Sequence, residues 1–266
     1  DIEKSKPAKG QVLIKVYASS INPFDIKFTG GMMPNAKLPV VLGGDIAGVI
    51  SEVGEGVEHF AVGNKVYGSA NALAGATGAF AEFAAVPISM IAKSPKNLDF
   101  NEVAASVLVG VSAVQGLLEH INLQPNQKIL IHGGTGGIGT MAIQIAKIIG
   151  AYVATTATGE GIDYVKKLGA DQIIDYKKKD FSQVISNFDA VFDTVGGETY
   201  KKSFEILKKG GIIVSMVMPV DEDLINQYSV TAISQFTKIT TEKLNMLTNF
   251  FENKGLKIHI DKVFLL

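Results

Sequence analysis

The sequence predicts an α/β protein of two domains, a β-rich domain followed by a doubly wound parallel-sheet domain. Three observations lead to this prediction. Short β-type runs separated by glycine clusters fill the first third of the chain, apolar strands alternate with helices in the second half, and a glycine-rich turn joins the first of those strands to its helix. The 266 residues, 47% of them hydrophobic, suffice for two domains with cores of their own.

The β-rich domain is predicted to span residues 1–100. No long helical period appears there, which favours a small β-barrel or sandwich. Four segments are predicted as strands between turn clusters such as Gly54-Glu55-Gly56: Gln11–Ile21, Asp45–Val53, Asn64–Ala70 and Ala79–Val86.

The second domain is predicted to span residues 101–266, beginning with a buried helix over Glu102–Ile121. The predicted strands are Lys128–His132, Tyr152–Thr156, Gln172–Tyr176, Ala190–Val195, Ile212–Met218, Val230–Thr237 and Leu256–Ile260. The predicted helices and helical turns between them are Gly137–Ile149, Gly161–Leu168, Phe181–Ser186, Thr199–Lys208 and Thr241–Asn253. Apolar strands spaced by helices indicate a parallel sheet covered on both faces, and right-handed crossovers favour the Rossmann order.

Composition excludes several classes of function. A net charge of −1 gives no electrostatic basis for binding nucleic acid or an anionic membrane. The sequence has no cysteine, which excludes disulfides and thiolate-bound zinc. No stretch approaches the ~18 uninterrupted apolar residues of a membrane span, and the charged first residues lack the apolar core of a secretory signal. We therefore expect a soluble, cytoplasmic protein.

The strongest local signal is the turn between the strand Lys128–His132 and the helix Gly137–Ile149, which contains Gly134-x-Gly136-x-x-Gly139. The first glycine allows a tight turn, the second lets the backbone approach a pyrophosphate, and the third permits close packing of helix and strand. The helix N-terminus presents unpaired N–H groups to the phosphates. The pattern predicts a dinucleotide site with contacts from Gly134, Thr135, Gly136, Gly137 and Ile138.

Longer motifs resemble those of a known family. Asn126–Lys147 resembles the cofactor signature of zinc-free quinone oxidoreductases, the zeta-crystallin-like family of the medium-chain dehydrogenase/reductase superfamily, although Thr135 replaces the small residue usual there. Asn22-Pro-Phe-Asp25 resembles the Asn-Pro-x-Asp turn of that family, and Pro39–Ile50 resembles its Pro-x-x-x-Gly-x-Asp-x-Ala-Gly segment. Two further elements of the family's cofactor domain are matched by Phe192–Gly197 and Gly210–Ser215.

The resemblance implies a GroES-like fold for the β-rich domain and a Rossmann NADP-binding domain after it. It also implies that a strand before Asp1 and a helix and strand after Leu266, which complete the GroES-like domain in relatives, lie outside this sequence. In zinc-dependent relatives a cysteine and a histidine ligand stand at the positions of Asn22 and Gly44. Neither residue can bind zinc in that way, so no metal is expected.

The chemistry that the resemblance implies is hydride transfer from NADPH to a quinone or to the β-carbon of an enone. Asn22, through its amide donor, and Asp25 are the candidate catalytic residues; alternatively they cap a helix that begins at Pro23. Further cofactor contacts are expected at Ser112, Thr156, Tyr176, Val195, Gly196, Met216 and Val217, although packing alone could explain Ser112, Met216 and Val217.

NADPH is expected over NADH because an NAD site carries an acid about 20 residues after the first glycine. Counting from Gly134 reaches Ala154–Thr158, which contains no acid, and the resemblance places Tyr176 near a 2′-phosphate, with Lys177 adding a positive charge. Two alternatives remain open, an enoyl-thioester reductase and a non-catalytic dinucleotide-binding protein. A homodimer is expected through Val230–Thr237, whose alternating pattern is typical of an edge strand.

Overall fold

The computed structural model describes residues 2–31 and 38–265. The chain divides into two compact units, Asp1–Val111 with Ile239–Leu266, and Ser112–Lys238. The predicted division at residue 100 differs from this one, because it placed the C-terminal segment with the parallel sheet. In the structure that segment joins the β-rich unit, since its helix packs against a strand there.

The first unit contains a five-stranded antiparallel sheet with the strand order β4-β1-β2-β3-β5. Its strands are β1 (Gln11–Ala18), β2 (Asp45–Val53), β3 (Lys65–Ser69), β4 (Phe83–Pro87) and β5 (Ile91–Lys93). Four of these were predicted, while the three-residue β5 is too short to show a period in sequence.

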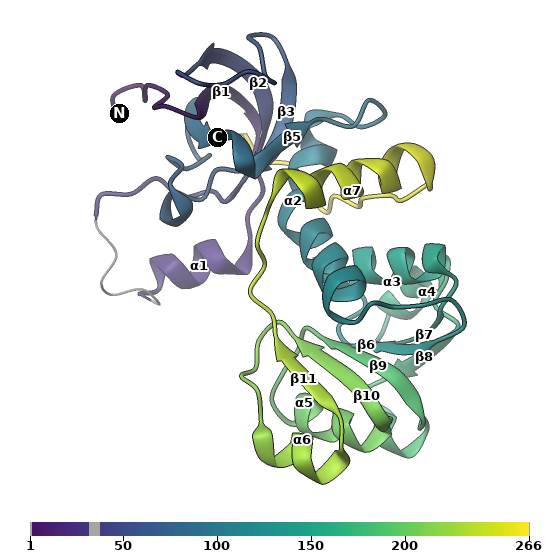
Figure 1. The fold of residues 1–266 in the computed structure, drawn as a ribbon. Helices are drawn as coiled ribbons and strands as arrows, with labels where there is room; N and C mark the ends of the chain where they lie inside the picture. The colour runs from purple at the N-terminus through teal and green to yellow at the C-terminus, as the bar shows by residue number, and fades with distance from the viewer. Residues whose placement is uncertain (1, 32–37, 266) are drawn as a thin grey trace. The chain divides into compact units, whose positions relative to one another are not determined.

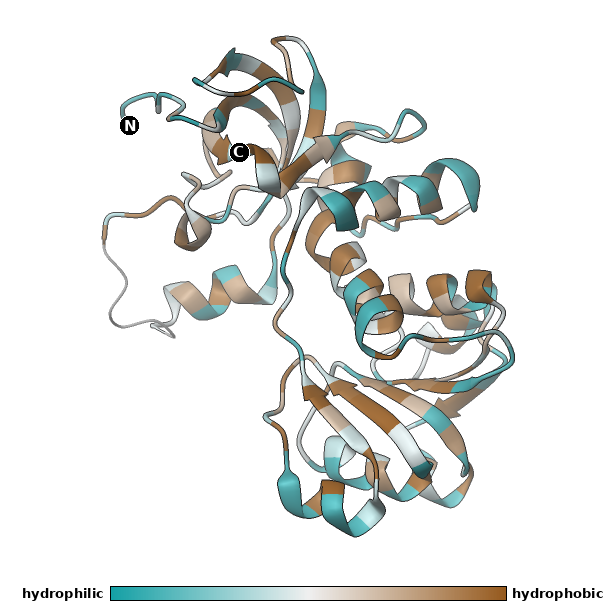
Figure 2. Cartoon of the chain, in the orientation of Figure 1, coloured by the Kyte–Doolittle hydropathy of each residue, from teal (hydrophilic) through white to brown (hydrophobic). Residues whose placement is uncertain are grey.

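Alternate side chains of these strands form the core of the first unit. Val12 and Ile14 of β1 are fully buried, and Ile14 pairs with Ile50 of β2. Full burial of one such side chain stabilises the fold by about 1.5–3 kcal/mol. Figure 2 shows hydrophobic residues concentrated in the strands of both sheets.

The helices of the first unit are α1 (Pro23–Thr29), α2 (Phe100–Val114) and α7 (Thr241–Asn253), with 3-10 turns η1 (Ala72–Ala74) and η2 (Ile88–Met90). Helix α7 buries Leu244, Leu247 and Phe251 on one face. The hydroxyl of Tyr67 donates to the Leu244 carbonyl at 2.5 Å, which ties α7 to β3. This docking explains why the end of the chain belongs to the β-rich unit.

Helix α2 continues without a break into a π-helical segment, η3 (Gln115–His120), so the predicted long helix is present in two forms. By length and composition the combined helix could cross a membrane, although its apolar residues are interrupted by Ser106, Ser112 and Gln115, in keeping with the expectation that no long uninterrupted apolar stretch exists. In this structure 67% of its most apolar window is buried inside the protein, as in the core helix of a globular protein.

The second unit contains a six-stranded parallel sheet with the order β11-β10-β9-β6-β7-β8 (Figure 1). Its strands are β6 (Lys128–Ile131), β7 (Tyr152–Ala157), β8 (Gln172–Asp175), β9 (Phe188–Asp193), β10 (Leu207–Ser215) and β11 (Thr231–Ser234). This order is the doubly wound arrangement that the alternation of strands and helices predicted. The fold class is therefore confirmed.

The connecting helices are α3 (Gly137–Ile149), α4 (Gly161–Lys167), α5 (Glu198–Ser203) and α6 (Glu222–Tyr228), with 3-10 turns η4 (Phe181–Gln183) and η5 (Phe204–Ile206). Two predictions were wrong. Helix α6 was missed, because it has seven residues and exposes most of them; its short apolar face of Leu224, Ile225 and Tyr228 packs partly buried against the core. The predicted strand Leu256–Ile260 has no strand pairing, since it follows α7 into the first unit, away from the parallel sheet.

Candidate functional site

The turn between β6 and α3 is built by glycines with different tasks. The left-handed backbone conformation is at Gly133, with φ of +68°, so this residue makes the tight turn that the motif assigned to Gly134. Gly134 is needed for another reason: a Cβ there would lie 2.1 Å from Oγ1 of Thr155 on β7. A Cβ at Gly139 would lie 2.2 Å from the carbonyl oxygen of Gly133. These glycines let strand, turn and helix approach closely.

Gly136 has the opposite surroundings. It is exposed at the N-cap of α3, and a Cβ there would have just one atom within 4 Å, the Gly133 carbonyl oxygen at 3.3 Å. The first helical hydrogen bond runs from Thr140 N to Gly136 O at 2.9 Å, so the N–H groups of Gly137 and Ile138 have no acceptor within the helix. An open space bordered by such N–H groups fits a pyrophosphate.

His132 directly follows β6 and supports this turn through the Thr156 hydroxyl. Its ring is fully buried, with Nε2 2.9 Å from Ser203 Oγ and Nδ1 3.4 Å from Thr156 Oγ1. Thr156 Oγ1 also accepts the N–H of Gly133 at 3.1 Å. Burial lowers the pKa of His132 to about 4, against the opposing effect of the Asp193 charge, so the ring is neutral at pH 7. Thr156, predicted to contact the cofactor, is 5% exposed and uses its hydroxyl to hold the turn.

Asp193 is the last residue of β9 and holds two loops at the carboxyl edge of the sheet. Its buried carboxylate accepts the N–H groups of Val195 and Gly196, each at 2.9 Å, and the hydroxyl of Ser215 at 2.7 Å. The Ser215 oxygen in turn accepts the N–H groups of Val217 and Met218 at 3.3 and 3.0 Å.

Four predicted cofactor residues, Val195, Gly196, Met216 and Val217, therefore lie in loops that one buried acid organises. Val195 and Val217 are about half exposed, and their side chains lie close to Gly133 and Gly196, respectively. Sequence reasoning missed Asp193 and Ser215, although both stand in motifs that carried the family resemblance. The sequence feature that could have identified them is that each is a polar residue at the end of a mostly apolar strand.

The ribose of the cofactor is predicted to lie at the ends of β7 and β8. As predicted, no acid lies in Ala154–Thr158. However, β8 pairs Asp175 with Ala157, and the Thr158 hydroxyl donates to the Asp175 carboxylate. That hydrogen bond, with Lys178 at 3.4 Å, holds the pKa of Asp175 below its usual range. Counting about 20 residues from Gly134 leads to the end of β7 and therefore missed Asp175, which ends the neighbouring strand β8. Tyr176 follows it, 57% exposed.

Ser112 is fully buried at the start of the second unit. Its hydroxyl lies 2.7 Å from Oγ1 of Thr237, and its carbonyl accepts Nε2 of Gln235 at 3.0 Å. The segment after β11 is thereby fixed to the long helix just before its π-helical turn. A contact between Ser112 and a cofactor stays a prediction.

The candidate catalytic residues Asn22 and Asp25 lie in the first unit. Asp25 accepts the N–H of Asn22 at 2.9 Å and that of Gly43 at 3.3 Å, so its predicted helix-capping role is present. The Asn22 amide group, expected to donate to substrate, donates within the protein instead. Its Nδ2 lies 2.7 Å from Asp45 Oδ2 and 3.2 Å from Ser20 Oγ.

Asp45, the first residue of β2, is 1% exposed and was not predicted as a site residue. Burial raises its pKa to about 7; hydrogen bonds from Ser20 and Asn22 oppose this rise and the Asp25 charge adds to it. A carboxyl group that titrates near neutrality can give or take a proton under physiological conditions. Its sequence signal was the aspartate of the Gly-x-Asp-x-Ala-Gly segment.

The residues do not fit a zinc ion. The sequence has no cysteine, and the positions of two zinc ligands hold Asn22 and Gly44. Within residues 2–31 and 38–265 no group of three or more His, Asp or Glu side chains is arranged to hold a metal.

Two models of known protein families match this chain. Residues 8–96 match the alcohol dehydrogenase GroES-like domain, and residues 137–252 match a model described as zinc-binding dehydrogenase. The second description concerns the family as a whole, because this chain lacks the zinc ligands.

Named relatives agree with these matches. The chain is 41% identical over 214 residues to a 2-methylene-furan-3-one reductase of Solanum lycopersicum, covering 77% of this chain and 54% of the relative. It is 38% identical over 214 residues to the chloroplastic NADPH-dependent alkenal/one oxidoreductase of Arabidopsis thaliana, covering 77% and 55%. The chain thus spans about half the length of these relatives. The solved quinone oxidoreductase of Coxiella burnetii superposes with a TM-score of 0.89 at 32% identity, covering 99% of this chain and 85% of that one.

Proposed function

Because this chain belongs to the quinone oxidoreductase family of medium-chain dehydrogenases/reductases, we propose that it reduces quinones or enones with NADPH and without a metal ion. The observation that carries the proposal is the exposed glycine turn at the carboxyl edge of the parallel sheet. It combines an open position at Gly136 with N–H groups that precede the first helical hydrogen bond. A dinucleotide pyrophosphate needs both features.

The bound cofactor would supply the hydride, and the protein's residues would hold it in place. Gly134, Thr135, Gly136, Gly137 and Ile138 would bind the pyrophosphate. The Asp193 carboxylate would keep the loops at Val195 and Val217 in position beside it, and the neutral His132 would keep Gly133 in its turn. Ser112 and Met216 would complete the cofactor contacts.

We propose a preference for NADPH over NADH. The absence of an acid in Ala154–Thr158 and the exposed Tyr176 support it, and Lys177 adds a positive charge nearby. Asp175 acts against it, because its carboxylate lies at the end of the neighbouring strand. We therefore expect a preference near the lower end of the ten- to hundredfold that one charge-assisted hydrogen bond of about 1.5–3 kcal/mol provides.

The acceptor classes follow from the relatives. Two are named as reductases of a methylene-furanone and of alkenals or enones, and one as a quinone oxidoreductase. Neither an enoyl-thioester reductase nor a non-catalytic binding protein is favoured by these relatives. Within the described residues no group of three or more His, Asp or Glu side chains is arranged to hold a metal, as a metal-dependent chemistry would require.

We also propose that the protein is a homodimer. In the described residues β11 pairs with β10 on one side, and its other edge is unpaired within the sheet. An edge of this kind can pair with its copy in a second chain. A cytoplasmic location remains our prediction, although the Arabidopsis relative is chloroplastic.

The test measures the oxidation of NADPH, from the loss of its absorbance, with a benzoquinone and with an α,β-unsaturated ketone as acceptors. Turnover of either acceptor by the purified chain supports the proposal, and the Gly136→Val variant should lose it. Cofactor binding without turnover of either acceptor would favour the binding protein instead. Light scattering at micromolar concentration tests the dimer, and a monomer would contradict that part.

A further inference from the structure

A sulfur atom joins the loops that follow β9 and β10 in the second unit. The backbone N–H of Gly197 donates to Sδ of Met218 at 3.3 Å. Met218 donates its own N–H to the Ser215 hydroxyl oxygen at 3.0 Å, and that hydroxyl donates to the Asp193 carboxylate at 2.7 Å. Asp193 also accepts the N–H groups of the two residues before Gly197, so this network connects both loops. Met218 is its sulfur-containing member.

The Met218 side chain borders both a glycine loop and a cavity. A Cβ atom on Gly196 would lie 3.1 Å from Sδ, so the sulfur rests against two consecutive glycines. Gly197 has a φ of +61°, a backbone conformation that favours glycine. Met218 also lines a cavity of about 310 Å³, together with Tyr200 and Val220. The residue is partly exposed, so a small oxidant dissolved in water can reach it.

The composition of the chain makes methionine the side chain that a mild oxidant attacks. The sequence has no cysteine and no tryptophan, but seven methionines. Met141 is fully buried, whereas Met218 combines partial exposure with a structural hydrogen bond to its sulfur. Hydroquinones, the products of the proposed quinone reduction, react with O₂ to give the quinone and hydrogen peroxide. Turnover of a quinone in air therefore supplies such an oxidant.

We propose that Met218 is a site of reversible oxidation that lowers the affinity for NADPH. The proposal rests on the cofactor site proposed above. A lone pair of the Met218 sulfur attacks one oxygen of hydrogen peroxide, so that an S–O bond forms and the O–O bond breaks. The proton of the transferred oxygen moves to the departing hydroxide, which leaves as water. The sulfur is oxidised to a sulfoxide and the peroxide is reduced; a methionine sulfoxide reductase reverses the change with electrons from a thiol.

The sulfoxide no longer holds the glycine loop. Its sulfur has used a lone pair and carries a partial positive charge, so it does not accept the N–H of Gly197. Because Gly197 is exposed, water takes over this N–H and the loop loses its connection to Met218. The two residues before Gly197 are proposed cofactor contacts, so their displacement weakens NADPH binding. The loss of one hydrogen bond of this kind corresponds to about fivefold in affinity.

The test treats the complete chain with hydrogen peroxide, removes the oxidant with catalase and then titrates NADPH. Peptide mass spectrometry should find Met218 sulfoxide, the affinity should fall about fivefold, and methionine sulfoxide reductase with dithiothreitol should restore it. Met218→Leu keeps an apolar side chain of similar size that peroxide does not oxidise, so treatment should change its affinity by less than about twofold. Met90→Leu, at a partly buried methionine of the first unit, is the matched control and should respond as the native chain does.

Amide hydrogen exchange is a second readout, and it needs no cofactor. Peroxide should speed the exchange of the peptide that contains Gly197 in the native chain and in Met90→Leu, but not in Met218→Leu. Should Met218→Leu not fold, reversal by the reductase in the native chain carries the same test. Native affinity of a chain oxidised at Met218, or an equal loss in treated Met218→Leu, would overturn the proposal. Failure of the untreated chain to bind NADPH would instead contradict the proposed function.

Discussion

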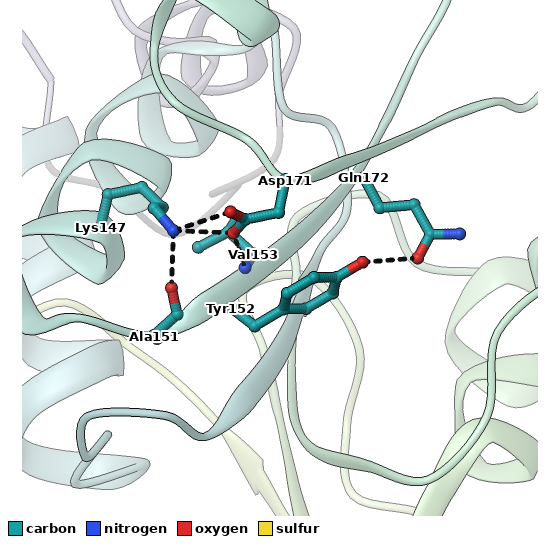
Figure 3. A network of polar contacts seen from close by, with 6 residues as sticks. All are labelled: Lys147, Ala151, Tyr152, Val153, Asp171 and Gln172. Carbon is teal, nitrogen blue, oxygen red and sulfur yellow. Dashed lines mark hydrogen bonds and ion pairs between the residues drawn. The ribbon is translucent and has the colours of Figure 1, made fainter.

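The two ends of the parallel sheet use an aspartate in different ways, partly exposed at one end and buried at the other. At the amino end, Asp171 accepts the Val153 N–H at 2.7 Å and pairs with Lys147 at 2.8 Å; the Lys147 ammonium also donates to the Ala151 carbonyl, as Figure 3 shows. At the carboxyl end, Asp193 is fully buried and accepts only neutral donors among the described residues, two N–H groups and the Ser215 hydroxyl.

This difference separates stability from function. At the amino end, Lys147 neutralises the Asp171 carboxylate. Both side chains also bind the main chain where β7 and β8 begin. The carboxyl-end acid fixes two loops whose outer residues remain exposed. Ligands of open parallel sheets bind at the carboxyl ends of the strands, so we propose that the acid there holds a binding surface in place.

The largest effect is expected from filling the glycine turn. Gly136→Val places a side chain in the pyrophosphate space, and loss of several charge-assisted hydrogen bonds should weaken NADPH binding by at least about 100-fold. The unfolding free energy should change by about 1 kcal/mol, because the residue is exposed and its Cβ would approach one atom, the Gly133 carbonyl oxygen at 3.3 Å. Gly30→Val, at an exposed glycine of the first unit whose Cβ would meet nothing nearer than 3.5 Å, is the matched control. Equal NADPH affinity of the two variants would contradict the assignment.

Replacing each of the two aspartates by asparagine, in separate variants, tests the comparison between the two ends of the sheet. Asp193→Asn leaves an amide N–H facing Ser215, which then lacks an acceptor for its own proton, so both loops should lose their fixed positions. We expect NADPH binding to weaken by about tenfold or more, since one charge-assisted hydrogen bond is worth about 1.5–3 kcal/mol. Asp171→Asn should cost about 1 kcal/mol of stability and leave NADPH affinity unchanged, because its ion pair is one-third exposed. Isothermal titration and urea unfolding measure both quantities; equal affinity losses would remove the distinction between the two ends.

The neutral His132 gives the carboxyl end a pH signature. Its pKa of about 4 in the folded protein lies below the value of about 6.5 in an unfolded chain, so the unfolded state binds more protons between these values. Its contribution to stability is therefore complete above pH 6.5 and is lost as the pH falls toward 4, by at most about 1.4 kcal/mol per pH unit.

Asp45 acts in the opposite direction over the same range, because its raised pKa favours the folded state at low pH. The measurement is thus the difference in unfolding free energy between the native protein and His132→Gln, in which the Asp45 contribution cancels. That difference should shrink between pH 7 and pH 4. A constant difference would show that His132 is not held neutral.

The smallest effect concerns the choice of cofactor. Asp175→Asn removes a carboxylate from the strand end beside the predicted ribose site, and the NADPH preference should rise by up to about fivefold, because water and salt screen an exposed charge. Separate titrations with NADPH and NADH check this. Lys178→Ala, which removes the partner of Asp175, should shift the preference toward NADH, and a change in the other direction would contradict the account.

The sequence predicted those elements whose formation depends on residues close together along the chain. The order of strands and helices from β6 to β10, the start of α1 at Asn22 and the glycine turn follow from local period and turn chemistry. The partners of Asp45 and Asp193 could not be predicted in this way. Ser20 lies 25 residues before Asp45, and Ser215 lies 22 residues after Asp193, so the contacts exist because strands pair. The end of the chain was misplaced for the same reason, since α7 docks on a distant strand.

The most direct test of the central claim is a titration of the native chain with NADPH and with NADH, followed by the fluorescence of the reduced nicotinamide. We predict one NADPH site per chain, with NADH binding about tenfold more weakly, in keeping with one charge-assisted hydrogen bond to the additional phosphate. Absence of NADPH binding, or tighter binding of NADH, would contradict the assignment of the carboxyl edge as an NADPH site.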